Sequence, residues 1–281
     1  MHRSTRESPA SPDAPPMVDH VWQGGSSSSS SEGGVSTPQY TRRLPVYLGN
    51  SEQYSFSPND CLGRGGFGDV FKGFRKRDNL PVVLKRVALR DVRYIQGVPS
   101  EVYFHSRCKS VPGVAKLISY YTTGRYMWMV MLHDSNMTGM DLFIDNMGGL
   151  PEYQAQEVLQ SIAILIQNLK NEGINHSDLK PANMLINPIS MEVKIIDFGL
   201  ARPYCNIETN CYGGTDLFLP PEVHESGSYV AENVVVWGLG LIYYYLLKGS
   251  YPFHSKRQII RCAFPMPSLT VTGDWLSPFS S

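Results

Sequence analysis

The chain has 281 residues, and its 25 Lys plus Arg balance 25 Asp plus Glu, so the formal net charge is zero. This balance argues against a protein whose main task is binding nucleic acid or an anionic membrane surface. Apolar residues make up 42% of the chain, which argues against a fully disordered protein. The five cysteines include no C-x-x-C pair, which disfavours a disulfide framework or a zinc finger and suits a reducing compartment.

The first 50 residues differ in composition from the rest, because they are rich in Ser, Pro and Gly and include the run Ser26–Ser31. Such a segment buries too little apolar surface to offset the entropy lost on ordering, so we predict a disordered tail over residues 1–50. No apolar stretch follows Met1–Arg6, and the longest apolar run, Val234–Leu247, is shorter than the ~20 residues of a membrane span. We therefore expect a soluble protein in the cytoplasm, with the nucleus as an additional location.

From about Gln53 the sequence alternates between β-rich runs and helical patterns. The β-rich runs predict a small, mostly antiparallel sheet, and they cover residues 54–62, 70–74, 82–87, 114–121 and 126–132. A short helix is expected over Ser100–Arg107, after Pro99. The following part is mainly helical: apolar residues recur every three or four positions in Glu152–Leu169, and Val234–Leu247 is apolar on all sides, as in a buried central helix. Residues 184–186 and 193–196 flank a turn. The fold class is therefore α+β.

Glycines at 63, 65 and 68 form a G-x-G-x-x-G pattern between two predicted strands. The pattern alone is weak, because in dinucleotide-binding folds the same spacing opens a helix. Here the strand-favouring residues 69–74 follow, so we predict a hairpin, which disfavours a dinucleotide-dependent oxidoreductase. A glycine hairpin lets the backbone approach phosphate oxygens closely.

Lys85 ends the apolar run Val82–Leu84, and Glu101 lies on the helix predicted after it. A Lys–Glu pair is often an exposed surface pair. In protein kinases the same pair holds the ammonium group against the α- and β-phosphates of ATP. The order of the other motifs favours that second interpretation.

The segment His176–Asn183 is similar to the kinase catalytic loop H-R-D-L-K-x-x-N, and Asp197-Phe198-Gly199 matches D-F-G. In such a site Asp178 accepts the proton of the substrate hydroxyl and Lys180 neutralises charge on the transferring phosphoryl group. Pro220-Pro221-Glu222 occupies the place of A-P-E. Motifs in this order are a strong signal for a protein kinase.

A closer resemblance is to the Pim family of serine/threonine kinases over about residues 53–262. It is carried by Gln53–Lys85, Val98–Val102, Asp141–Phe143, Pro220–Glu222 and Ile259–Arg261, and by Val235, which stands where most kinases have an Asp before Trp237. The resemblance implies a bilobal fold, with an N-lobe over 53–132, a hinge over 133–140 and a C-lobe over 141–281. It also implies phosphorylation of Ser or Thr in protein substrates with Mg²⁺ and ATP.

The resemblance further implies roles for individual residues. The catalytic set is Lys85, Glu101, Asp178 and Lys180, and the Mg²⁺ ligands are Asn183 and Asp197. The ATP-binding set is Leu62, Gly63, Arg64, Gly65, Gly66, Phe67, Gly68, Val70, Val83, Lys85 and Leu185. The substrate-binding residues are Asp141 and Thr215.

Several positions depart from the family pattern. Ser177 replaces the catalytic-loop Arg that pairs with an activation-loop phosphate, so we do not expect activation through Thr209 or Tyr212. Ala182 stands where basophilic kinases have a Glu, while Asp141 is retained, so the preference for basic substrates should be weakened. His105 is expected to stack on Phe198 in place of an apolar residue.

The end of the chain departs most, because residues 261–281 show no helical period where the family continues with further helices. We therefore expect a shortened C-terminal lobe. Two functions stay open: an active Ser/Thr kinase, which the complete set of phosphoryl-transfer residues favours, and a kinase-shaped binding or scaffold protein. The sequence does not reveal the physiological substrates or the oligomeric state.

Overall fold

The computed structural model describes residues 48–65, 68–205 and 214–262, all within one compact unit, Thr41–Ser281. Apart from residues 48–50, the predicted tail lies outside these ranges, and so do Thr209, Tyr212 and residues 263–281. In the described ranges, no helix combines the length and apolar character needed to cross a membrane.

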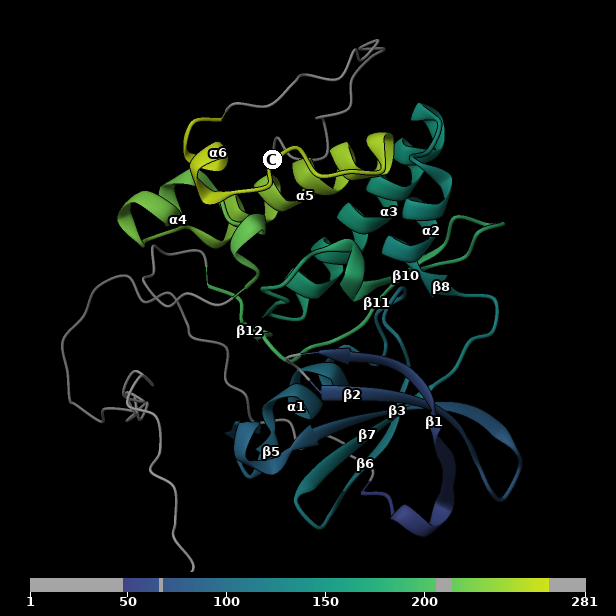
Figure 1. The fold of residues 1–281 in the computed structure, drawn as a ribbon. Coiled ribbons are helices and arrows are strands. Elements are labelled where there is room, and N and C mark those ends of the chain that lie inside the picture. Colours follow the sequence, from purple (N-terminus) through teal and green to yellow (C-terminus); the bar gives the residue numbers. More distant parts are fainter. Residues whose placement is uncertain (1–47, 66–67, 206–213, 263–281) are drawn as a thin grey trace, which may run out of the picture. The chain divides into compact units, whose positions relative to one another are not determined.

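The N-terminal part is built on a five-stranded antiparallel sheet with the strand order β1-β2-β3-β7-β6 (Figure 1). Its strands are β1 (Tyr54–Gly65), β2 (Gly68–Arg75), β3 (Leu80–Ala88), β6 (Leu117–Thr123) and β7 (Tyr126–Leu132). All five predicted strands are present. The fourth begins at Leu117 instead of Val114, because Val114 makes only an isolated bridge to Ile195.

Strand β7 shows how the sheet forms a core on both of its faces. Its side chains alternate in direction, so Met127 and Met129 join one cluster of buried residues with Val102. The intervening Trp128 and Val130 join a second cluster on the other face. A strand covered on both sides is apolar throughout, which explains the unbroken run of large hydrophobic residues from 126 to 132.

A short hairpin, β4 (Tyr94–Ile95) and β5 (Val98–Pro99), leads into helix α1. The helix spans Ser100–Arg107, as the sequence predicts, and Pro99 precedes its first turn. Residues from Glu101 to Ser106 are all buried, so α1 is enclosed on every side instead of presenting a polar face. This enclosure brings the carboxylate of Glu101 into the protein interior.

The C-terminal part is mainly helical, with α3 packed along α5 (Figure 1). Its α-helices are α2 (Met140–Met147), α3 (Glu152–Asn171), α4 (Pro221–Ser226), α5 (Ala231–Lys248) and α6 (Lys256–Ile260). Short 3-10 helices occur in both parts of the fold. In the N-terminal part they are η1 (Ser51–Gln53) and η2 (Leu89–Asp91), and in the C-terminal part η3 (Pro181–Asn183) and η4 (Asp216–Phe218). Ile144, Ile162 and Ile242 join α2, α3 and α5 in one core, and the α+β class predicted from the sequence is confirmed.

Two small sheets position the segments that carry the sequence motifs. One is β11 (Val193–Ile195), β10 (Met184–Ile186) and β8 (Thr138–Gly139), in that order, and the other pairs β12 (Arg202–Pro203) with β9 (Ile174–Asn175). The segment 176–183 runs from β9 to β10, and the segment 196–201 runs from β11 to β12. Because β10 pairs with β11 and β9 with β12, both ends of the two segments are held together.

Helix α5, predicted as a buried central helix, is buried along one side only. Its buried residues are Ala231, Gly238, Leu241, Ile242, Tyr245 and Leu246, whereas Val236 is 63% exposed. With 3.6 residues per turn, a helix packed on one side leaves the opposite side open whatever its composition. The apolar run therefore predicted the helix correctly but not its surroundings.

The one-sided burial of α5 can be tested with two substitutions that shorten side chains of this helix. Ile242→Ala should lower the free energy of unfolding by about 2–5 kcal/mol, because the Ile242 side chain is fully buried. Val236→Ala should change it by less than about 0.5 kcal/mol, as substitutions at exposed positions usually do. Chemical denaturation of both variants is the measurement, and similar losses would contradict the one-sided burial of α5.

Candidate active site

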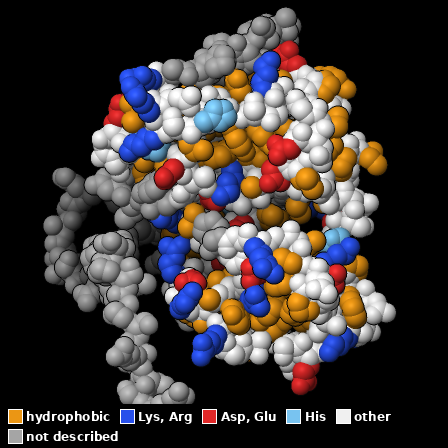
Figure 2. Space-filling model, in the orientation of Figure 1, with side chains coloured by type: hydrophobic (Ala, Val, Ile, Leu, Met, Phe, Trp, Pro, Cys, Tyr) orange, Lys and Arg blue, Asp and Glu red, His pale blue; other side chains and the backbone are white. Residues whose placement is uncertain are grey.

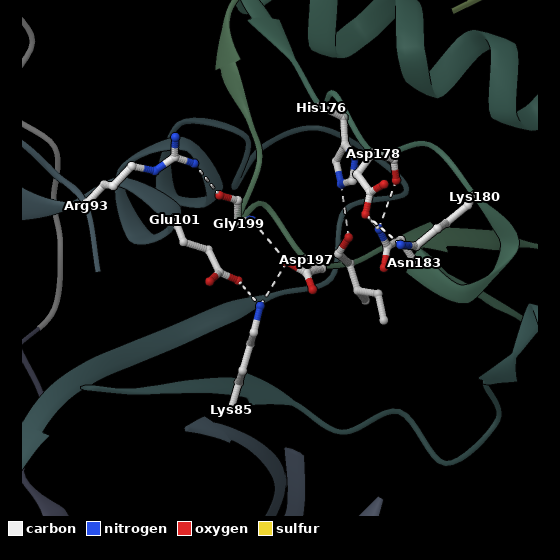
Figure 3. Close-up of polar contacts among 10 residues, drawn as sticks. Lys85, Arg93, Glu101, His176, Asp178, Lys180, Asn183, Asp197 and Gly199 are labelled. Carbon is white, nitrogen blue, oxygen red and sulfur yellow. Dashed lines mark hydrogen bonds and ion pairs between the residues drawn. The ribbon is translucent and has the colours of Figure 1, made fainter. Parts of the chain in front are cut away.

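The side chain of Lys85 joins three separate parts of the fold (Figure 3). From β3, its Nζ contacts Glu101 Oε1 of α1 at 2.7 Å and Asp197 Oδ1, after β11, at 2.8 Å. Lys85 is 4% exposed and Glu101 is 8% exposed. The Lys–Glu pair suggested by the sequence is therefore a buried contact and not a surface pair, and Asp197 shares the same ammonium group.

One cation between two carboxylates sets the protonation of this cluster. Burial by itself opposes the charge of Lys85, but Glu101 and Asp197 overcome that effect and raise the pKa of Lys85 above its usual value. Burial would also raise the pKa of Asp197, yet Lys85 and the Gly199 amide hold it below its usual value. For Glu101, burial outweighs the attraction of Lys85, so the pKa of this carboxyl is raised. Lys85 and Asp197 thus form the stably ionised pair of the cluster.

The backbone around Asp197 is fixed in an unusual conformation. Asp197 has φ +64°, which is rare for a residue other than glycine. The Gly199 amide donates to Asp197 Oδ1 at 3.0 Å, and the Arg93 guanidinium donates to the Gly199 carbonyl, also at 3.0 Å (Figure 3). Backbone strain of this kind persists only where surrounding contacts impose it, and it occurs often at functional sites.

The carboxylate of Asp178 is bound by three other residues of the predicted site. Asn183 Nδ2 donates to both the backbone oxygen and Oδ2 of Asp178, each at 2.8 Å. Thr215 Oγ1 donates to Oδ1 at 2.8 Å, and Lys180 Nζ lies 2.8 Å from Oδ2. Lys180 Nζ also donates to Thr215 Oγ1 at 2.7 Å. With Asp178 only 5% exposed, its carboxylate has one defined orientation.

Backbone contacts connect the Asp178 and Asp197 clusters. His176 Nε2 donates to the carbonyl of Ile196 at 3.0 Å, and the Ile196 amide donates to the carbonyl of Asn183 at 2.9 Å. The residue before Asp197 is therefore bonded on both sides to the segment that carries Asp178. These bonds join the two clusters into one site.

Phe198 lies between two histidine rings. The His105 ring stacks on Phe198 at 4.8 Å with an interplanar angle of 25°, as the sequence suggested, and His176 meets it edge-on at 5.1 Å. His105 Nε2 donates to the Ala115 carbonyl at 2.6 Å. Among the described residues, Nδ1 of both histidines is buried without a hydrogen-bond partner. Burial lowers the pKa of His105 to about 4, so this ring is neutral at physiological pH.

The glycine segment forms the hairpin that the sequence predicts. Gly63 pairs with Val70, and Gly65 pairs with Gly68. Gly68 has φ +117°, and a Cβ there would lie 2.2 Å from the Arg86 carbonyl oxygen, so no other residue fits. Leu62, Gly63, Arg64 and Gly65 are exposed, whereas Gly66 and Phe67 lie outside the described residues.

Three apolar residues of the predicted ATP-binding set are half-buried and come from different strands. Val70 is on β2, Val83 on β3 and Leu185 on β10. Val70 is directly opposite Lys85 in the β2–β3 ladder, and Val83 is two positions before Lys85. The side chains of Val70, Val83 and Lys85 therefore project from the same face of the sheet.

Asp141, a predicted substrate-binding residue, lies apart from these clusters. It is in the first turn of α2, where its Oδ1 accepts from the Leu142 amide at 2.8 Å.

The structure also shows contacts that the sequence did not predict. Asp134, in the predicted hinge, forms an ion pair of 2.7 Å with Lys194 of β11, and this bond lowers the pKa of Asp134. No sequence signal predicted the Asp134–Lys194 pair or the contact of Arg93 with Gly199, because the partners lie far apart along the chain.

Comparison with known proteins agrees with this geometry, since the protein kinase domain family matches residues 56–275. The chain belongs to the protein kinase domain family. It is 32% identical over 203 residues to serine/threonine-protein kinase prk-2 of Caenorhabditis elegans, covering 70% of this chain and 46% of that protein. It is 33% identical over 223 residues to a probable myosin light chain kinase of Dictyostelium discoideum, covering 76% of this chain and 61% of the relative.

A third similar protein is serine/threonine-protein kinase pim-2 of Danio rerio, with 26% identity over 221 residues, or 73% of this chain and 71% of the relative. The chain therefore spans less than two thirds of the length of the first two relatives, 46% and 61%. The kinase fold is confirmed, and the relatives from Caenorhabditis elegans and Danio rerio are named as serine/threonine-protein kinases. The sequence match to a Pim protein is no stronger than the match to other kinases of this group.

The buried His105 predicts a measurable pH dependence of stability. The unfolded chain binds a proton near the ordinary histidine pKa of about 6.5, whereas folded His105, with its pKa lowered to about 4, does not. Stability should therefore fall as the pH decreases from 7.5 to 5.5, by about 1 kcal/mol from this residue.

His105→Leu should remove this contribution, so the decrease in Tm between pH 7.5 and 5.5 should be smaller than in the wild type by about 2–4 °C. Thermal unfolding at both pH values is the measurement. His254→Leu, which changes an exposed histidine, is the control and should behave as the wild type. An unchanged pH response of His105→Leu would show that His105 does not titrate as described.

Proposed function

We propose that this kinase domain transfers the γ-phosphate of ATP to Ser or Thr hydroxyls of protein substrates, with Asp178 as the catalytic base. The observation that carries the proposal is the orientation of the Asp178 carboxylate by Lys180, Asn183 and Thr215. A base must be held within hydrogen-bond reach of the proton it accepts. Lys180, bonded to the same carboxylate, supplies the positive charge that a transferring phosphoryl group requires.

The residues proposed to hold Mg²⁺ have side-chain oxygens available. Asn183 uses its amide nitrogen for Asp178, which leaves its oxygen, and Asp197 uses Oδ1 for Lys85 and Gly199, which leaves Oδ2. Carboxylate and amide oxygens are the ligands that Mg²⁺ prefers. When bound, the ion neutralises negative charge on the ATP phosphates. The donor set therefore fits the metal.

Lys85 is proposed to bind the α- and β-phosphates, with Glu101 holding its ammonium group in place. The glycine hairpin from Leu62 to Gly68 is proposed to cover the phosphates, and Val70, Val83 and Leu185 to contact the adenine. The half-burial of these three apolar side chains supports a base-binding role, because a bound ring would complete their cover.

The proposed acceptor is a serine or threonine hydroxyl in a protein with basic residues nearby. Lys180, found at this position in Ser/Thr kinases, and the Ser/Thr kinase relatives support the hydroxyl class. Asp141 supports a basic substrate, and a closer relation to the Pim group rests on the motifs quoted above. On the face seen in Figure 2, acidic and basic side chains are interspersed, which favours a protein partner over nucleic acid. A cytoplasmic location stays a prediction of the sequence.

A kinase-shaped scaffold without activity is the alternative, and the residue contacts argue against it. Lys85, Glu101, Asp178, Asn183 and Asp197 all retain the contacts that phosphoryl transfer needs. A site kept only as a binding surface has no requirement for these buried charges, which are costly unless they are paired. A radiolabel transfer assay with Mg²⁺, ATP and a basic Ser/Thr peptide decides between the two functions.

Asp178→Asn should lower kcat by about 10²-fold or more, because the amide cannot accept the hydroxyl proton. ATP affinity should change little, since Asp178 is bonded to Lys180, Asn183 and Thr215 and not to Lys85. Steady-state kinetics with a peptide substrate is the measurement, and Asp91→Asn at an exposed position is the control. Full turnover by Asp178→Asn would remove Asp178 from the proposed role.

Ala182→Glu tests the proposed preference for basic substrates. Ala182 is exposed within η3, so a Glu fits without disturbing the core and restores a carboxylate beside the catalytic segment. An exposed charge pair contributes ~0.2–1 kcal/mol and a bidentate one more, so kcat/KM for Arg-containing peptides should rise several-fold, with neutral peptides unaffected. A flat preference would show that the peptide does not pass near Ala182.

A further inference from the structure

The residue directly before Asp178 has an unfavourable backbone conformation. Ser177 has φ +64°, in the left-handed region that residues other than glycine seldom adopt. It lies between β9 and Asp178, and its carbonyl oxygen approaches Gly214, where a Cβ would lie 3.0 Å away. Because such a conformation persists only when neighbouring groups impose it, some contact must hold Ser177.

The contact comes from the side chain of Asn175. Its Oδ1 accepts from the Ser177 amide at 3.1 Å, and its backbone oxygen accepts from Ser177 Oγ at 3.4 Å. Asn175 is itself anchored, since it belongs to β9 and pairs with Arg202 of β12. Asn175 therefore ties the turn at Ser177 to the strand that follows the Asp197 segment.

Helix α5, which faces this turn, offers no substitute for Asn175. A cavity of about 30 Å³ separates them, with Asn175, Ser177 and Asp178 on one side and Val234, Val235 and Gly238 of α5 on the other. None of these three α5 residues has a polar side chain. Without Asn175 the Ser177 amide would lose the acceptor that Asn175 Oδ1 provides, and a partly buried amide without an acceptor is unfavourable.

We propose that Asn175 is a positioning residue for catalysis: its amide oxygen holds the Ser177 peptide group in the left-handed turn and thereby aims the Asp178 carboxylate. The inference rests on the proposed kinase function. The Asp178 side chain and its own backbone oxygen both bond Asn183, so a change in the direction of the chain entering Asp178 moves the carboxylate relative to Lys180 and Thr215. Misplacement of a reacting group by about 1 Å can lower a rate about 10²-fold.

The test compares three variants of the full chain in steady-state kinetics. Asn175→Ala should lower kcat about 10-fold to 100-fold while the KM for ATP stays within about twofold of the wild type. Asn175→Asp keeps an oxygen acceptor and should retain most of the activity. Asn187→Ala is the matched control, because Asn187 Oδ1 accepts from the amides of Ile189 and Ser190 in the same manner, in the turn between β10 and β11, and its kcat should be unchanged.

A second measurement does not depend on activity. Residue-resolved hydrogen exchange should show faster exchange of the Ser177 amide in Asn175→Ala than in the wild type, with no such change in Asn187→Ala. If the wild type transfers no more phosphate than Asp178→Asn, the proposed function fails, and hydrogen exchange alone then decides whether Asn175 holds the turn. An unchanged kcat, or unchanged Ser177 exchange, in Asn175→Ala would overturn the inference.

Discussion

The buried ammonium group of Lys85 is the contact on which the rest of the site depends. A charge with 4% exposure is tolerated only when it is paired, and its partners come from α1 and from the segment after β11. The charge thus requires the sheet, the helix and the C-terminal part to be in their present positions at once. Removing either carboxylate would leave the positive charge of Lys85 with one ion-pair partner instead of two. The pairing therefore couples the fold of the N-terminal sheet to the position of Asp197.

The geometry of Asp178 follows from this constraint through the backbone. Asp197 is fixed by Lys85 and by the Gly199 amide, and the preceding Ile196 is bonded to His176 and Asn183. Asn183 in turn holds Asp178. A site that draws its charges from separate elements therefore behaves as one rigid assembly, which suits a reaction that depends on positioning and electrostatic stabilisation.

The same assembly tolerates polar groups in places where an apolar residue would satisfy packing. His105 and His176 enclose Phe198, yet Nδ1 of each ring lacks a partner among the described residues. Keeping both rings neutral avoids burying a further charge beside Lys85, and the low pKa of His105 agrees with this. Stability at neutral pH is thus obtained together with sensitivity to acid.

The sequence alone determined the main elements of this protein and its family. The strand-favouring residues after Gly68 distinguished a hairpin from a helix-opening loop, apolar spacing located α3 and α5, and the order of motifs around Lys85, Asp178 and Asp197 indicated the family. These signals are local: they depend on residue type and on spacing of a few positions, and such patterns can be identified along a single chain.

Only the tertiary structure decided which residues meet and which faces are covered. The exposed face of α5, the bond from Thr215 to Asp178, the Asp134–Lys194 pair and the role of Asn175 beside Ser177 were not evident from the sequence. Most of these features join residues far apart along the chain, and the contact of Asn175 with Ser177 is anchored by the pairing of β9 with β12. Periodicity shows that a helix has an apolar side, but the partner that covers that side is chosen by the packing of the whole chain.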